Sequence, residues 1–269
     1  MIRRSYLFLA AICAFLAITP LLSVDAADWE ESTEIAEIFK ASGLTGTFVL
    51  FDVDGGSFVG YNKGRAETRF IPASTFKIPN SLIGLSVGAV TSVDEVLPYR
   101  RDPKPSTKAW EKDMGLREAI IVSNVPIYQA LARRIGFDRM QDNLAKMDYG
   151  NNEIGTSIDT FWLLGPLMIS SVEQTRFLAK LAQGRLPFPE AAQKSVRDIT
   201  ITDTGVNWTL HAKTGWQNAP DPGVGWWVGW VEKDNHVYAF ALNIDIRKES
   251  DGAKRIELGK ASLKALGII

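Results

Sequence analysis

The sequence reads Pro72-Ala73-Ser74-Thr75-Phe76-Lys77 where a helical pattern begins. If these residues start a helix, Ser74 and Lys77 lie three positions apart on one face, so the hydroxyl and the amine can meet. A serine hydroxyl is a poor nucleophile until a base removes its proton. Burial lowers the pKa of a lysine and leaves the amine neutral, which lets it act as that base. The stretch therefore predicts Ser74 as a nucleophile and Lys77 as its base.

A second interpretation of the same stretch is a surface helix start with Ser74 as the N-cap. Ser-x-x-Lys occurs by chance roughly once in a chain of this length at average composition. The choice between the two interpretations depends on what the rest of the chain adds.

The composition is that of an ordinary globular protein. The chain has 269 residues, of which 46% are hydrophobic and 23% charged, and its formal net charge is −1. These values predict a substantial core in one domain or in two closely packed ones. Because there is no surplus of basic residues, we expect no nucleic-acid partner.

The N-terminal segment has the features of a signal peptide. Residues 1–4 are a short basic region with two arginines, residues 5–22 are almost entirely apolar, and Val24-Asp25-Ala26 fits the small-residue rule for cleavage. We expect residues 1–26 to be removed, leaving a periplasmic protein of a Gram-negative bacterium without further membrane association. An uncleaved membrane anchor is the alternative, because the apolar run is long. The only cysteine, Cys13, lies in this segment, so the mature chain would have no disulfide and no thiol chemistry.

Residues 27–269 are predicted to form one α+β domain. Periodicity and turn residues indicate an antiparallel sheet built from N- and C-terminal strands, with flanking helices and an inserted all-helical region. The sheet part covers about 27–65 and 185–269, and the helical part about 66–184. The expected strands are 46–52, 58–61, 208–213, 225–231 and 236–245. The expected helices are 29–40, 74–85, 116–122, 126–135, 171–182 and 253–266, with a loop at 98–108 and a capping box starting at Ser171.

Two further stretches can complete a site for acyl transfer. Ser123-Asn124-Val125 comes just before Pro126, which favours a helix start, so Ser123 is predicted at a break between two helices. Lys213-Thr214-Gly215 ends a predicted strand, and a glycine there lets a ligand approach the backbone. Each stretch also has a purely structural interpretation, an N-cap for the first and a strand end with a turn glycine for the second.

The conjunction of the three stretches resembles the penicillin-recognising serine enzymes, which include β-lactamases and penicillin-binding proteins. The Ser-Asn-Val follows the Ser-x-x-Lys by about 50 residues, and the Lys-Thr-Gly follows about 90 residues later. Other stretches narrow the resemblance to class D, the oxacillinase-type β-lactamases, across essentially the whole mature chain. These are Trp110-Glu111-Lys112-Asp113-Met114, Tyr149-Gly150-Asn151, Phe161-Trp162-Leu163, Gly225-Trp226-Trp227-Val228-Gly229-Trp230 and Arg255.

The resemblance implies a role for each reacting side chain. Ser74 attacks the lactam carbonyl and becomes acylated. Lys77 is carboxylated by CO2 and serves as general base for acylation and for deacylation by water. Trp162 donates its indole N–H to that carbamate, and Ser123 relays a proton to the departing nitrogen. Neither a metal nor a bound cofactor is expected.

The resemblance also implies a set of substrate-binding groups. Lys213, Thr214 and Arg255 hold the carboxylate of the β-lactam, and Gly215 lies beside them. The backbone N–H groups of Ser74 and Trp216 form the oxyanion hole. Apolar walls come from Val125 and Leu163, and the loop around Trp110 shapes the substrate preference.

Several alternatives remain open from the sequence. The chain can be a penicillin-binding or β-lactam-sensing protein that is acylated without turnover, or an exported binding module without catalysis. Trp162 and Trp110 can be core aromatics, and Arg255 an exposed helix arginine. The tryptophans at 226, 227 and 230 are interpreted as sheet packing, and Tyr149 and Asn151 as shaping a loop. His211 and His236 lack the spacing of a metal site.

Overall fold

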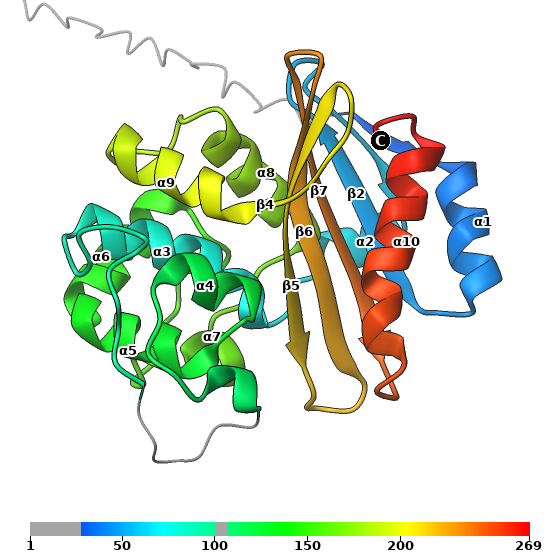
Figure 1. The fold of residues 1–269 in the computed structure, drawn as a ribbon. Helices are drawn as coiled ribbons and strands as arrows, with labels where there is room; N and C mark the ends of the chain where they lie inside the picture. The colour runs from blue at the N-terminus through cyan, green and yellow to red at the C-terminus, as the bar shows by residue number, and fades with distance from the viewer. Residues whose placement is uncertain (1–27, 100–106) are drawn as a thin grey trace, which may run out of the picture.

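The computed structural model describes residues 28–99 and 107–269, and Figure 1 shows their arrangement. The expected signal peptide at 1–26, its cysteine and most of the expected loop at 98–108 lie outside the described residues. No helix within the described ranges has the length and apolar content needed to span a bilayer.

Seven strands form one sheet in the order β1-β3-β2-β7-β6-β5-β4. The strands from the two ends of the chain meet at its centre, where β2 pairs with β7. Every neighbouring pair is antiparallel except β1 and β3, so the expected antiparallel sheet is in fact mixed. The bounds are β1 Trp29–Glu31, β2 Gly46–Asp52, β3 Ser57–Tyr61, β4 Ile201–Thr204, β5 Trp208–Gln217, β6 Gly223–Lys233 and β7 His236–Ile246.

Helices cover both faces of the sheet (Figure 1). Helices α1 (Thr33–Ser42) and α10 (Asp251–Ala265) pack on one face, and α8 (Ser171–Ala182) packs on the other. Strand β6 serves both cores by alternation: Trp226 and Trp230 belong to the core on the helical side, and Trp227 to the core under α1 and α10. The three tryptophans therefore do pack the sheet, as predicted.

The inserted helical region lies beside the sheet and contributes one wall of the cleft between them. Its elements are α2 Lys63–Glu67, η1 Ala73–Phe76, α3 Lys77–Ser86, η2 Lys108–Trp110, α4 Leu116–Ile121, α5 Val125–Ile135, α6 Phe137–Met147, α7 Phe161–Leu164 and α9 Glu190–Thr200, besides α8. Helix α9 packs against α3 and α4, so the helical region continues past the expected boundary near residue 184.

Two expected helix starts and the expected capping box differ from the structure. The helix expected at 29–40 begins only at Thr33, because Ser32 accepts the N–H of Ile35 as the N-cap and residues 29–31 form β1 instead. The capping box starts at Ser170 rather than Ser171, with Glu173 as its partner.

The helix expected at 74–85 is divided into the 3-10 turn η1 and helix α3, which begins at Lys77. Pro79 explains the division, because a proline has no N–H to donate to a preceding turn. With α3 starting at Lys77, Pro79 falls in its first turn, where a backbone N–H has no partner in the helix anyway. Ser74 is thereby placed on a tighter turn than an α-helix, directly ahead of the helix that carries Lys77.

Candidate active site

A cavity of about 850 Å³ lies where the helical region meets β5. Its walls come from parts of the chain that are far apart in the sequence. Nine of the twelve predicted site residues line it: Ser74, Trp110, Ser123, Val125, Leu163, Thr214, Gly215, Trp216 and Arg255. Lys213 does not line the cavity itself but contacts Ser123, which does. Lys77 and Trp162 are completely buried behind this surface.

Ser74 and Lys77 meet as the three-residue spacing predicts. Lys77 Nζ lies 2.8 Å from Ser74 Oγ and 5.3 Å from the centroid of the Tyr128 ring. The Lys77 side chain is 0% exposed. Burial, and then the charge of Lys213, hold the pKa of Lys77 well below its usual range. This shift favours the neutral amine, the form that can accept the Ser74 proton.

Trp162 has a buried donor with no partner. Its Nε1 makes no hydrogen bond to any of the described residues, although the side chain is 0% exposed. An unsatisfied buried donor costs about 1–3 kcal/mol, so such a group usually serves a ligand or an unseen acceptor. The indole stacks on Phe76 with ring centroids 5.3 Å apart, and α7 packs against η1. Trp162 is thus beside the turn that carries the nucleophile and its base.

Ser123 and Lys213 connect the two walls of the cavity. Ser123 lies between α4 and α5 with φ of 55°, a left-handed conformation that turns the chain at the predicted helix break. The N-cap of α5 is Asn124, whose Oδ1 accepts from Ile127 N at 3.0 Å. Lys213 Nζ lies 3.0 Å from Ser123 Oγ. Burial and the nearby charge of Arg255 lower the pKa of Lys213 to about 7.

Gly215 permits a close contact between β5 and the nucleophile turn. A Cβ placed on Gly215 would lie 2.9 Å from Pro72 O and 3.0 Å from Thr75 Cγ2. Any larger residue would therefore push β5 away from η1. The glycine thus allows two segments of the protein to pack closely against each other.

Arg255 is not an exposed helix arginine. It is half-buried at the cavity, with its guanidinium carbon 5.3 Å from the Trp216 ring. Its Nη1 donates to Gly215 O and its Nε donates to Gly252 O at 2.5 Å. Burial lowers its pKa to about 10, which leaves it positively charged at pH 7. The cation is held at the end of β5, where an anionic substrate group can reach it.

The expected wall residues occupy the mouth of the cavity. Trp110 Nε1 donates to Val122 O at 2.9 Å, so its ring lies over the segment that carries Ser123. Trp110, Val125 and Leu163 are half-buried and line the cavity, which excludes the core interpretation of Trp110.

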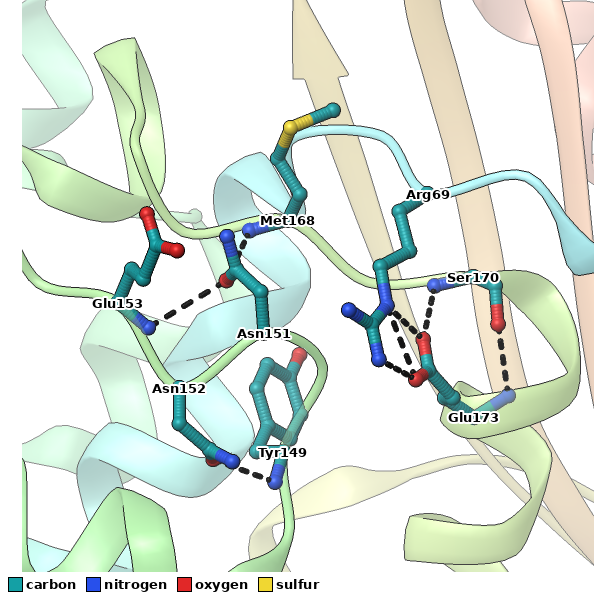
Figure 2. Close-up of polar contacts among 8 residues, drawn as sticks. All are labelled: Arg69, Tyr149, Asn151, Asn152, Glu153, Met168, Ser170 and Glu173. Carbon is teal, nitrogen blue, oxygen red and sulfur yellow. Dashed lines mark hydrogen bonds and ion pairs between the residues drawn. The ribbon is translucent and has the colours of Figure 1, made fainter.

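Tyr149, Gly150 and Asn151 form a structural loop, as their alternative interpretation held. Figure 2 shows the Asn151 amide facing Met168, whose backbone N–H it accepts at 2.9 Å, while Asn151 Nδ2 donates to Pro166 O at 2.9 Å. Tyr149 is fully buried. These contacts tie the loop to the segment that leads into α8, outside the cavity.

The far end of the cavity was not predicted by residue. It is lined by Ile246 at the end of β7 and by residues of the β5–β6 and β7–α10 loops: Asn218, Asp221, Arg247, Lys248 and Glu249. Loops carry no periodic signal, and these two come together only because β5 and β7 flank β6. No group of three or more His, Cys, Asp or Glu side chains that could hold a metal occurs within residues 28–99 and 107–269.

Known proteins share both the sequence and the fold. Residues 46–264 match the model of the penicillin binding protein transpeptidase domain. The chain is 44% identical over 235 residues to β-lactamase OXA-5 and 40% identical over 242 residues to β-lactamase OXA-10, both of Pseudomonas aeruginosa. These matches cover 86% and 89% of this chain, and 87% and 91% of the two relatives.

A solved structure gives the same result. The crystal structure of FUS-1 (OXA-85), a class D β-lactamase from Fusobacterium nucleatum subsp. polymorphum, superposes with a TM-score of 0.86 at 45% identity, covering 89% of this chain and 100% of that one. The α+β fold and the family resemblance read from the motifs are confirmed. The chain belongs to the class D β-lactamase family.

Proposed function

We propose that this protein hydrolyses β-lactams through an acyl-enzyme at Ser74, with Lys77 carboxylated by CO2 as the general base. The observation that carries the proposal is the Ser74–Lys77 pair, 2.8 Å apart, in which the lysine is completely buried and its pKa is held well below the usual range by that burial. The hydrolase activity agrees with the β-lactamase names of relatives at about 40% identity.

In the acylation step, Ser74 Oγ attacks the lactam carbonyl carbon while its proton passes to the base at Lys77. Ser123 relays a proton to the lactam nitrogen as the carbon–nitrogen bond breaks. Its distance of 3.0 Å from Lys213 Nζ gives the hydroxyl a route for replacing that proton. The backbone N–H groups of Ser74 and Trp216 stabilise the negative carbonyl oxygen. Hydrolysis of the acyl-enzyme then needs an activated water molecule that attacks the ester carbonyl at Ser74.

The substrate carboxylate is assigned to the β5 wall. Lys213, Thr214 and Arg255 present two cations and a hydroxyl at the end of the strand. A carboxylate bound there leaves the lactam ring facing Ser74. Arg255 is already fixed by its two carbonyl partners, so little side-chain entropy is lost when the anion binds.

Two features support carboxylation of Lys77. A neutral amine can add to CO2, releasing one proton and leaving an anionic carbamate, whereas an ammonium cannot. A buried anion needs hydrogen-bond donors, and Trp162 Nε1 is a buried donor without a partner among the described residues. The carbamate supplies a base that can activate water after Ser74 is esterified.

The test is hydrolysis of benzylpenicillin by the mature protein in single-turnover and steady-state experiments, with and without added bicarbonate. We expect sustained turnover that bicarbonate stimulates, and a carbamate resonance when the enzyme is equilibrated with 13C-labelled bicarbonate. Ser74→Ala is the control, which keeps Lys77 and should show neither acylation nor turnover. A stoichiometric burst that stops, indifferent to bicarbonate, would instead identify a penicillin-binding or sensing protein.

The cellular location is a separate proposal, supported by the basic start, apolar run and small-residue site at 1–26. We expect the protein in the periplasmic fraction with a mature N-terminus near Ala27. A full-length mass in the membrane fraction would contradict this and identify an anchor.

A further inference from the structure

The turn that presents Ser74 contains a strained residue. Ala73 has φ of 49°, in the left-handed region that side chains with a Cβ rarely adopt. Such a conformation persists only when its surroundings hold it, and it is found mainly at functional sites. Left to itself, Ala73 would relax toward negative φ, which would redirect Ser74 Oγ away from Lys77.

The sheet holds one side of this turn. Trp226 on β6 donates from Nε1 to Ile71 O at 2.9 Å, across 155 residues of sequence. Trp226 is 0% exposed and lies opposite Gly215 in the β5–β6 ladder. Phe70 packs edge-on against its ring, with centroids 6.4 Å apart. Trp226 therefore fixes the carbonyl two residues before the strained position.

Helix α8 holds the other side. Gln174 donates from Nε2 to Thr75 Oγ1 at 2.9 Å, and Thr75 Oγ1 donates to Pro72 O at 2.8 Å. Tyr149 OH lies 3.4 Å from Gln174 Oε1, which keeps the amide in this orientation. Gln174 is 1% exposed, in the middle of the core. The carbonyl directly before Ala73 is thus also fixed.

The start of α8 is held by polar contacts of Ser170, Glu173 and Arg69, which Figure 2 shows. Ser170 and Glu173 form the capping box, and Arg69 donates from Nε and Nη2 to the Glu173 carboxylate at 2.5 to 3.0 Å. Arg69 also begins the segment that runs through Ile71 to Ser74. The helix that bears Gln174 and the segment that leads into the turn are therefore joined by this ion pair just before the turn.

From these contacts we infer that Trp226 and Gln174 are positioning residues, which hold the turn 71–75 in its strained form so that Ser74 Oγ faces Lys77 Nζ. Neither side chain lines the cavity, so neither touches substrate. The inference rests on the proposed acyl-enzyme at Ser74. It gives a functional role to Trp226, which the sequence indicates only as a residue that packs the sheet. It gives a second such role to Gln174, which belongs to none of the sequence motifs.

The test compares Trp226→Phe with Trp230→Phe. Both tryptophans are 0% exposed, lie on β6 and pack in the same core, but Trp230 Nε1 donates to Glu232 Oε1 instead of toward the turn. We expect similar losses in Tm for the two variants. The acylation rate constant of Trp226→Phe in single turnover should fall about 10-fold to 100-fold, because small displacements of a nucleophile have effects of that size. The acylation rate of Trp230→Phe should stay near that of the wild type.

Gln174→Met provides a second variant of nearly the same shape, which removes the hydrogen bonds and keeps the helix. It should also slow acylation, and Ala73→Gly should restore part of the rate in the Trp226→Phe background, because glycine adopts positive φ without strain. Equal acylation rates for Trp226→Phe and Trp230→Phe, or no recovery with Ala73→Gly, would overturn the inference. Failure of the wild-type protein to be acylated would overturn the proposed function instead.

Discussion

The two walls of the cavity each bury a lysine, and they use it differently. On the helical wall, Lys77 has a serine hydroxyl and the face of Tyr128 as neighbours, and no anion in the described part of the chain offsets its burial. On the sheet wall, Lys213 contacts three oxygens and shares its surroundings with Arg255. The helical wall thus favours a neutral amine, while the sheet wall gathers positive charge. Under the proposed function, bond making and anion recognition are therefore assigned to two different layers of the fold.

The largest effect on activity is expected when the base on the helical wall is removed. Lys77→Ala should lower kcat for benzylpenicillin by about 10²-fold to 10⁴-fold, the usual contribution of a general base. The loss should fall most heavily on deacylation, so mass spectrometry should detect an accumulated acyl-enzyme. Turnover like that of the wild type would contradict the role assigned to Lys77.

A smaller effect is expected from the unpartnered indole on the same wall. Trp162→Phe keeps an aromatic ring against Phe76 but removes Nε1. Deacylation should slow by about tenfold, because a lost hydrogen bond to a charged group is worth about 1.5–3 kcal/mol. The bicarbonate concentration for half-maximal activity should rise. If the bicarbonate dependence is unaltered, Trp162 does not serve the carbamate.

A substitution on the sheet wall should change KM rather than kcat. Arg255→Ala should raise KM for carboxylate-bearing β-lactams by about tenfold, since it removes one charge-assisted partner of the substrate. The methyl ester of the same β-lactam is the matched control, because it lacks the anion and its KM should change little. Equal changes for acid and ester would mean that Arg255 supports the wall without binding the carboxylate.

The smallest expected effect is a pH dependence on the sheet wall. With a pKa of about 7, Lys213 is charged below neutral pH and loses its charge as the pH rises. For anionic substrates, kcat/KM should therefore fall by roughly threefold to tenfold between pH 7 and 8.5, because this parameter reports the free enzyme. Arg255 stays charged over that range and limits the loss.

A matched variant sharpens this measurement. Lys213→Arg carries a guanidinium that remains charged, so its kcat/KM should be flat over the same interval even if its absolute value is lower. A profile that falls equally in the variant would assign the titration to another group.

Sequence patterns predicted the parts of the fold that are long and regular. Strands β2, β6 and β7 alternate or run apolar over seven residues or more, and their positions were predicted. Strands β1 and β4 have only three and four residues, mostly exposed, and exist because they add to the edges of a sheet formed by others. Helix α9 was missed although its buried residues Ala192, Val196 and Ile199 recur at helical spacing after a proline-rich turn.

The candidate site likewise contains residues that could be predicted from the sequence and residues that could not. Ser74 and Lys77 are three residues apart, so local geometry was enough to pair them. Trp226 and Gln174 donate hydrogen bonds to residues of this turn that are 155 and 99 positions away in the sequence. Contacts between such distant residues cannot be predicted from a local sequence pattern. Predictions from sequence therefore found the reacting groups and missed the groups that hold them in place.

The pairing of β2 with β7 has a consequence for how the molecule is made. Gly46 lies opposite Ile244, so the central ladder joins residues almost 200 positions apart. During synthesis, the N-terminal hairpin must keep an unpaired edge until nearly the whole chain has emerged. Contacts between residues so far apart in the sequence make folding slow and give aggregation-prone intermediates. We expect the nascent chain to depend on chaperones, and truncations before β7 to aggregate rather than to yield a smaller folded unit.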